Sequence, residues 1–267
     1  MNIISSKDNE FVKHIRKLKN KKYRDEFSEY IIEGTKIIQE AIAQSVPFSC
    51  IVICEDCIEN KEIDSKLMYA IAKYKCIYVT RNVFNTLTDA QNPQGMLAIA
   101  CMPENIKTDT VADLIVVLEA IQDPGNLGSI LRTIDSVGLK QVIISKNSAD
   151  VYNPKVVRST MGAIFRVNVI ETENMADTLQ ALKKQKYKIV STSLDAGKSV
   201  FGFDFSKSVL VIGNEGNGVS EEIIKLSNEL VKIPMPRQNR KPKCSSSNRN
   251  NPIRICKAKD VVKPLFI

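Results

Sequence analysis

The sequence contains a single histidine, His14. A metal site that needs several histidines is therefore excluded, and a histidine-based catalytic dyad would have only His14 available. Cysteine is present seven times, but Cys54 and Cys57 form a C-x-x-C pair that no second pair follows at zinc-ribbon spacing. We interpret this pair as a coincidence at the end of a strand. The cysteines have the usage typical of free thiols in a reducing compartment, and the sequence predicts no metal site.

Long apolar runs are also missing. No segment is long and apolar enough to span a bilayer, and the first residues do not have the pattern of a secretory signal. The default expectation is therefore a cytoplasmic protein. With 43% hydrophobic and 25% charged residues among 267, the composition is that of a globular protein large enough for two domains.

Acidic residues are outnumbered, with 30 Asp and Glu against 38 Lys and Arg, a net charge of +8. This balance favours a polyanionic partner, although many basic proteins bind no nucleic acid. Cations are concentrated between Asn9 and Phe27, where Phe11, Ile15 and Leu18 have helical spacing. The cations of this predicted basic helix form either a solvated face or a face that contacts phosphates.

The segment from Asp113 to Ile144 has the pattern of a β-turn-α-β unit. Residues 114–118 are β-formers and predict a buried strand. The residues Asp123-Pro124-Gly125-Asn126 predict a turn, and residues 128–137 have apolar side chains at helical spacing. Such units build parallel sheets, which bind ligands at the turns that follow their strands.

Strands and helices alternate on both sides of this unit and predict two α/β domains. The first covers residues 1–103, a linker covers 103–110, and the second begins at 111. In the second domain we expect a helix over 156–165, a helix capped by Ser220, and strands at 167–170, 188–191, 210–212 and 231–233.

The turn from Gly213 to Gly218 contains three glycines in six residues, directly after a predicted strand. Glycine lets a backbone approach a ligand closely. The G-x-G-x-x-G spacing of dinucleotide-binding turns is absent, and a glycine-rich turn on its own is more often only a turn.

Taken in order, these stretches resemble the motifs of the SpoU (TrmH-like) RNA ribose 2′-O-methyltransferases of the SPOUT superfamily. Residues 210–220 (LVIGNEGNGVS) are similar to motif 2, residues 231–235 (VKIPM) to the start of motif 3, and residues 153–167 also fit the family. The residues that match motif 1 are Asp123, Pro124, Gly125-Asn126, Gly128 and Arg132. The resemblance covers most of residues 2–236.

The resemblance implies a small ribosomal-protein-like α/β domain at 1–103 that binds RNA, and a parallel-sheet α/β knot (SPOUT) domain at 111–236. It implies transfer of a methyl group from S-adenosylmethionine to a ribose 2′-hydroxyl of structured RNA, rRNA more than tRNA, by a homodimer. The backbone of Gly213, Ile233 and Met235 would surround the adenosine of the cofactor.

Given this family resemblance, we favour RNA contact for the basic helix. The residues assigned to RNA are Lys17, Lys19, Lys21, Lys22, Arg158 and Arg166.

The chemistry requires a poor nucleophile, the ribose hydroxyl, to lose its proton while it attacks the methyl group of a sulfonium. We assign the central role to Arg132, whose guanidinium is a fork of donors suited to phosphate and developing oxyanion together. The family is often described with this arginine as the general base. A guanidinium normally keeps its proton at neutral pH, so we favour an electrostatic role, with proton loss to water or phosphate. Asn126 would orient Arg132 or the ribose, and Glu215 would pair with substrate or orient the arginine.

The resemblance fails after Pro236. Motif 3 should continue into a stretch like GKTESLNAAVATGIILYE, which supplies cofactor contacts and an apolar helix for the knot and dimer. The chain instead has the polar sequence RQNRKPKCSSSNRNNPIRICK.

The genetic code offers a cause for this divergence. When the codons that can encode this stretch are read one nucleotide later, they permit ESLN, then a small apolar run, and further on TGIILYEYVK. We therefore hypothesise a frameshift near residues 236–238. As written, the tail 237–267 would be largely disordered, the knot incomplete and the dimer weakened. The alternative function is then a catalytically inactive RNA-binding protein.

Overall fold

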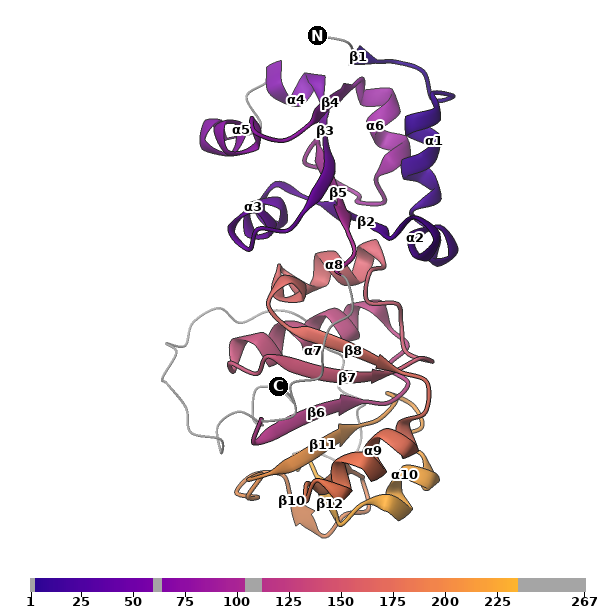
Figure 1. The fold of residues 1–267 in the computed structure, drawn as a ribbon, viewed down its shortest axis with the longest axis vertical. Coiled ribbons are helices and arrows are strands. Elements are labelled where there is room, and N and C mark those ends of the chain that lie inside the picture. The colour runs from indigo at the N-terminus through magenta and orange to yellow at the C-terminus, as the bar shows by residue number, and fades with distance from the viewer. Residues whose placement is uncertain (1–2, 60–63, 104–111, 235–267) are drawn as a thin grey trace.

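The computed structural model describes residues 3–59, 64–103 and 112–234. They form two α/β units, drawn one above the other in Figure 1, with a five-stranded sheet in the first and a seven-stranded sheet in the second. The predicted α/β fold class is confirmed. The aberrant tail, Met235 and the completeness of the knot lie outside the described residues. None of the helices in the described ranges is long and apolar enough to cross a membrane.

The first unit has a mixed sheet in the order β1-β4-β3-β5-β2, in which β5 is antiparallel to both neighbours. The alternation of strands and helices that the sequence predicts is present in this unit. The bounds are β1 (Ile3–Ile4), β2 (Glu29–Glu33), α3 (Thr35–Ala43), β3 (Phe48–Cys54), α4 (Glu55–Glu59), α5 (Ser65–Ile71), β4 (Cys76–Val79), α6 (Arg81–Leu87) and β5 (Met96–Cys101).

The predicted basic helix is two helices, α1 (Glu10–Lys17) and α2 (Lys21–Phe27). The break occurs at Asn20, whose side chain accepts a hydrogen bond from the backbone N–H of Lys22 at 3.0 Å. An asparagine that caps a new helix competes with continuation of the old one. The prediction of one continuous helix was therefore wrong, and the axis of α2 need not continue that of α1.

The second unit has a sheet in the order β10-β12-β9-β11-β6-β7-β8, and every pairing in it is parallel. All of its carboxyl ends therefore meet at one edge. Buried residues of α7 and α8 pack on one face of β6, and those of α9 and α10 pack on the other. The bounds are β6 (Leu114–Leu118), α7 (Pro124–Ser136), β7 (Gln141–Ser145), α8 (Pro154–Thr160), η1 (Ala163–Phe165), β8 (Asn168–Thr172), α9 (Met175–Lys184), β9 (Lys188–Thr192), β10 (Lys198–Ser199), β11 (Ser208–Ile212), α10 (Glu221–Leu226) and β12 (Glu229–Lys232).

Two helices of the second unit differ from the prediction. The predicted turn at residues 123–126 contains the first turn of α7, because Asp123 caps the helix and Pro124 occupies its first position, where the fixed φ of proline fits. The predicted helix over 156–165 is α8, which ends at Thr160, followed by η1. Met161 and Gly162 have φ values of 51° and 91°, and these left-handed residues end the helix.

The two units meet at α8, which lies between the two sheets in Figure 1. Val157 of α8 is fully buried and belongs to the hydrophobic core of the first unit. The rings of Tyr30 and Tyr152 contact each other across the junction, with centroids 4.7 Å apart. Burial raises the pKa of Tyr152 to about 12 and raises that of Tyr30 also, so both phenols stay neutral.

Candidate functional site

The loops that follow β6 and β11 are joined by hydrogen bonds at the carboxyl edge of the second sheet. The backbone N–H of Ser220 donates to the Glu119 carboxylate at 2.9 Å. The side-chain amide of Asn214 donates to the carbonyl of Ala120 at 2.8 Å. The stretches that resemble motifs 1 and 2 therefore form one surface, at the place where parallel sheets bind ligands.

The glycine-rich loop folds back on itself. Asn214 and Gly218 exchange two backbone hydrogen bonds of 3.0 and 2.9 Å. A Cβ atom on Gly213 would lie 2.2 Å from the carbonyl carbon of Gly218, so only glycine permits this closure. Gly213 is thus required by the loop itself, and its predicted contact with a cofactor stays a prediction.

Asn126 and Glu215, predicted separately as catalytic residues, are in direct contact. The Asn126 Nδ2 amide donates to Glu215 Oε1 at 3.0 Å, although 89 positions separate them. Asn126 is placed by the first turn of α7, where its N–H donates to the Asp123 carboxylate at 2.8 Å. The bond fixes the side chains that project from the two motif loops.

Arg132 lies six residues beyond Asn126 on α7, about 9 Å further along the helix axis. Its side chain is exposed and makes no hydrogen bond or ion pair with the residues that the structure describes. The structure does not bring it to the Asn126–Glu215 pair. Its five guanidinium donors have no acceptor among the described residues.

Two of the predicted cofactor residues, Gly213 and Ile233, directly follow β11 and β12. Residues beyond β9 are held against β12, where the N–H of Ser193 donates to the carbonyl of Val231 at 2.9 Å. The next residue, Leu194, is 80% exposed, an unusual position for a large apolar side chain. Exposed apolar surface beside backbone groups at strand ends fits a nucleoside, whose ring is flat and whose edges are polar. Ile233 is half-buried at this edge, and Met235 lies outside the described residues.

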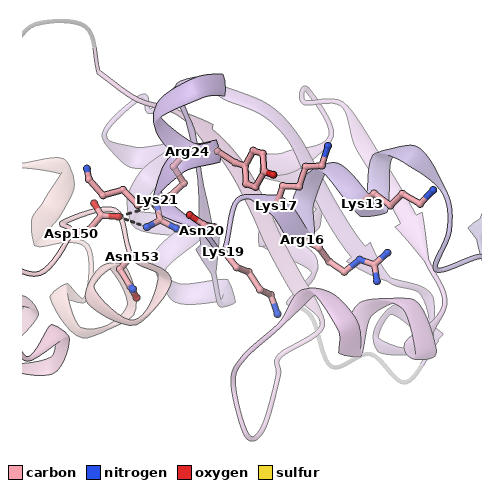
Figure 2. Close-up of a pocket in the computed structure, with 10 residues that line it drawn as sticks. Lys13, Arg16, Lys17, Lys19, Asn20, Lys21, Arg24, Asp150 and Asn153 are labelled. Atoms are coloured by element: carbon pink, nitrogen blue, oxygen red, sulfur yellow. Dashed lines mark hydrogen bonds and ion pairs between the residues drawn. The ribbon is translucent and has the colours of Figure 1, made fainter.

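A second feature is an open groove of about 890 Å³ at the junction of the two units. Figure 2 shows the basic side chains of α1 and α2 along it, with Asp150 and Asn153 contributed by the second unit. Of the four lysines assigned to RNA, Lys17, Lys19 and Lys21 line the groove. Lys22 does not line it, but its ammonium group lies 5.6 Å from the ring centroid of Tyr23, which does. Lys19 also forms an ion pair with Asp89 at 2.7 Å. The basic segment therefore faces a shared surface of both units.

An ion pair between Arg24 and Asp150 holds the two sides of this groove together, as the dashed lines in Figure 2 mark. Arg24 is only 2% exposed and also donates to the carbonyl of Leu18 at 2.7 Å. Arg24 is one of the cations of the basic segment, which were predicted to form a solvated or phosphate-contacting face, and for Arg24 this prediction was wrong because its side chain is buried. No role was predicted for Asp150, because 126 positions separate the two residues and no local pattern pairs them.

The two arginines assigned to RNA have partners within the protein. Arg158 forms an ion pair with Glu33 at 2.7 Å, and Arg166 contacts both Asp135 at 2.8 Å and Glu40 at 2.7 Å. The hydrogen bond to Asp135, with the charge of Glu40, raises the pKa of Arg166. Both arginines join the two units, and their contact with RNA stays a prediction.

The start of α8 lies between the groove and the motif loops. Asn153, which lines the groove, caps α8, and Lys155 two residues later has its Nζ 3.9 Å from the Asp123 carboxylate. Gly128 lets α7 pack closely against α8, because a Cβ there would lie 2.4 Å from Ser159 Cβ.

Glu119 was not among the predicted site residues. It could have been found in the sequence, since a carboxylate directly after a parallel strand is a typical ligand position.

The thiols of the described cysteines form no disulfide, and burial raises the pKa of Cys50 to about 12. Within the described ranges no group of three or more His, Cys, Asp or Glu side chains is placed to hold a metal ion.

Comparisons with known proteins agree with this geometry. Residues 113–241 match the SpoU rRNA Methylase family, and residues 9–98 match the MRM3-like substrate binding domain. The chain is 31% identical over 236 residues to the 23S rRNA (guanosine(2553)-2'-O)-methyltransferase RlmP of Bacillus subtilis (strain 168), a match covering 88% of this chain and 91% of that protein.

Two further proteins extend the similarity. The uncharacterized tRNA/rRNA methyltransferase slr1673 of Synechocystis is 28% identical, with 88% of this chain and 86% of that protein covered. The structure of an AdoMet-bound rRNA methyltransferase from Sinorhizobium meliloti has a TM-score of 0.75 at 25% identity, over 99% of this chain and 96% of that one. The chain therefore belongs to the SpoU rRNA methylase family, as its motifs predicted.

Proposed function

We propose that this protein transfers a methyl group from S-adenosylmethionine to a ribose 2′-hydroxyl of RNA, with rRNA as the favoured substrate. The observation that carries the proposal is the 3.0 Å hydrogen bond between Asn126 and Glu215. It joins the two motif loops at the carboxyl edge of a parallel sheet, and Arg132 lies further along α7, the helix that carries Asn126. Family membership supports the reaction class, and the B. subtilis relative, by its name, acts on 23S rRNA.

In this proposal Arg132 meets the substrate. Because it is exposed and has no partner among the described residues, its guanidinium can contact a phosphate and the developing oxyanion together. Asn126 and Glu215 hold the loops at a fixed separation, and the proton of the hydroxyl leaves to water or phosphate. The protein mainly aligns the reactants and supplies a preorganised electrostatic environment.

Bound S-adenosylmethionine supplies the electrophilic methyl group. The residues that would hold it are the backbone of Gly213 and Ile233, together with Met235. Leu194 would cover one side of the adenosine, because its exposed side chain follows β9, the strand between β11 and β12. This assignment is tested by cofactor binding in a Leu194→Asp variant, which should bind more weakly than the parent.

RNA would bind across the first unit and along the groove, with Lys17, Lys19, Lys21 and Lys22 as phosphate contacts. A homodimer and a cytoplasmic location belong to the same proposal. Residues 1–103 would serve as the RNA-binding domain, and the match to a substrate binding domain over residues 9–98 supports this.

The proposal is tested by methyl transfer from labelled S-adenosylmethionine to purified rRNA and tRNA. The assay uses the chain as written and a second version in which the frame after Pro236 is restored. Arg132→Ala should lower the rate on the order of 10²–10³-fold, the usual cost of removing one preorganised donor. Lys146→Ala is the matched control, because it removes an exposed cation that is paired with Glu173.

Near-normal activity of Arg132→Ala would contradict the role of that residue. A second candidate function, RNA binding without catalysis, is favoured by the sequence after Pro236. Calorimetric titration with S-adenosylmethionine separates the two, because an inactive binder would retain RNA and fail to take up the cofactor.

A further inference from the structure

An aromatic ring lies among the cations of the groove. Tyr23, on α2, lines it, and the ammonium groups of Lys17 and Lys22 each lie 5.6 Å from the ring centroid. The ring is held in place by Phe27, whose plane is tilted by only 14° from that of Tyr23 at a centroid distance of 6.2 Å. Tyr23 is thus an oriented, half-buried ring flanked by two positive charges.

Two amide groups lie in the same groove. Asn20 and Asn153 use their Oδ1 atoms to cap α2 and α8, accepting from backbone N–H groups at 3.0 and 2.9 Å. Their Nδ2 groups make no hydrogen bond with the residues that the structure describes. The groove therefore offers a ring, cations and amide donors, from both units, within one cavity.

A single carboxylate, that of Asp150, lines the groove, and its charge is neutralised by an ion pair, so it would repel an anion only weakly. Asp150 is paired with Arg24, and this ion pair leaves the remaining charge of the groove positive. Figure 2 shows the two side chains directed at each other, while Lys13 and Lys17 extend away from them. A polyanion would meet cations along most of the groove.

We propose that this groove holds an unpaired segment of the substrate RNA, with one base stacked on Tyr23 and the adjoining phosphates on Lys17 and Lys22. The proposal rests on the proposed function and adds the kind of RNA that the site takes. A duplex needs only cations, because its bases are already stacked on each other. An oriented ring and amide donors suit an unpaired base, whose face and edge are both accessible.

The lysines would change partners when RNA binds. Each ammonium is at the end of a flexible stem and can leave the tyrosine ring for a phosphate, while the ring face goes to a base. Affinity would then have two parts, an ionic part that falls with salt and a stacking part that does not.

The test is fluorescence anisotropy with a mixed-sequence single-stranded RNA of about 12 nucleotides, within the span of single-strand sites, and the same strand in a duplex. Tyr23→Ala should weaken single-strand binding about tenfold and leave the slope of log K against log salt unchanged. Tyr23→Phe should bind like the parent, because it keeps the stacking face. Tyr69→Ala, at a tyrosine 88% exposed on α5 and outside the groove, is the control and should change nothing.

A folding defect is distinguished by Tyr23→Leu, which keeps apolar packing against Phe27 and should lose as much affinity as Tyr23→Ala. Unchanged binding of Tyr23→Ala, full binding of Tyr23→Leu, or tighter binding of the duplex than of the single strand would each overturn the proposal. If the parent protein methylates RNA and Tyr23→Ala binds normally, only the stacking is wrong. If the parent binds no RNA at all, the proposed function fails with it.

Discussion

Replacing Arg24 should destabilise the protein far more than replacing any exposed cation. Its side chain is 2% exposed and donates to two groups, the Asp150 carboxylate and the carbonyl of Leu18. Arg24→Met keeps much of the apolar stem and removes only the guanidinium. The carboxylate, 14% exposed, then loses its counter-charge, and the buried carbonyl loses its donor.

The size of the effect follows from these losses. Removing one partner of a buried ion pair costs about 3–5 kcal/mol, because the other charge stays desolvated and unpaired. The partial exposure of Asp150 admits some water, so we expect the lower half of that range, about 3–4 kcal/mol. The double variant Arg24→Met, Asp150→Asn should recover part of the loss, because no uncompensated charge remains and the Asn oxygen can still accept from the backbone N–H of Tyr152. The carbonyl of Leu18 stays without its donor, so recovery should be incomplete.

Urea unfolding followed by far-UV circular dichroism measures the free energy of unfolding for each variant. Lys146→Ala is the matched control, since its ion pair with Glu173 has side chains 60% and 75% exposed. It should change the free energy of unfolding much less than Arg24→Met, because solvent screens an exposed ion pair. Two results would contradict a structural role for this ion pair: Arg24→Met no more destabilising than the control, or a double variant no more stable than Arg24→Met.

Two further predictions concern the basic groove and the end of the chain. The lysines assigned to RNA are Lys17, Lys19, Lys21 and Lys22. Replacing all four with Gln should weaken RNA binding and reduce the slope of log K against log salt by about 3. An unchanged slope would mean that these lysines form only a solvated face. The nucleotide sequence over the codons for residues 236–245, with the intact mass of the expressed protein, should show an ESLN-like segment in the displaced frame. If that frame encodes no such segment, the tail is a genuine divergent ending.

The strands were predicted well because their signal is local. Residues 114–118 are five consecutive apolar residues, and the strand β6 has the same bounds with all five buried. The helix boundaries were predicted less well, since they depend on single capping side chains. Asn20 divides the basic segment, and Asp123 begins α7 inside a predicted turn, although both residue types are ordinary turn and cap formers.

The site was predictable only in parts. Asn126 and Glu215 could be selected by resemblance, but nothing in either stretch says that their side chains touch. The ion pair of Arg24 with Asp150 and that of Arg158 with Glu33 join residues more than a hundred positions apart. Such pairs follow from the packing of whole domains, and a helix-surface arginine has the same local sequence signal whether it meets RNA or a carboxylate.

Helix α8 belongs structurally to both units, and this has a consequence for substrate selection. Val157 is in the core of the first unit, whereas Ser159 packs against Gly128 of α7. Asn153 lines the groove, and Lys155 lies beside the Asp123 carboxylate that caps α7. Each of these contacts is made within two turns of one helix, so a rigid element sets the separation between the groove and the motif loops. RNA bound in the groove would therefore present a nucleotide at a fixed distance along its strand to Arg132, and substitutions in α8 should change which nucleotide is reached before they change the chemistry.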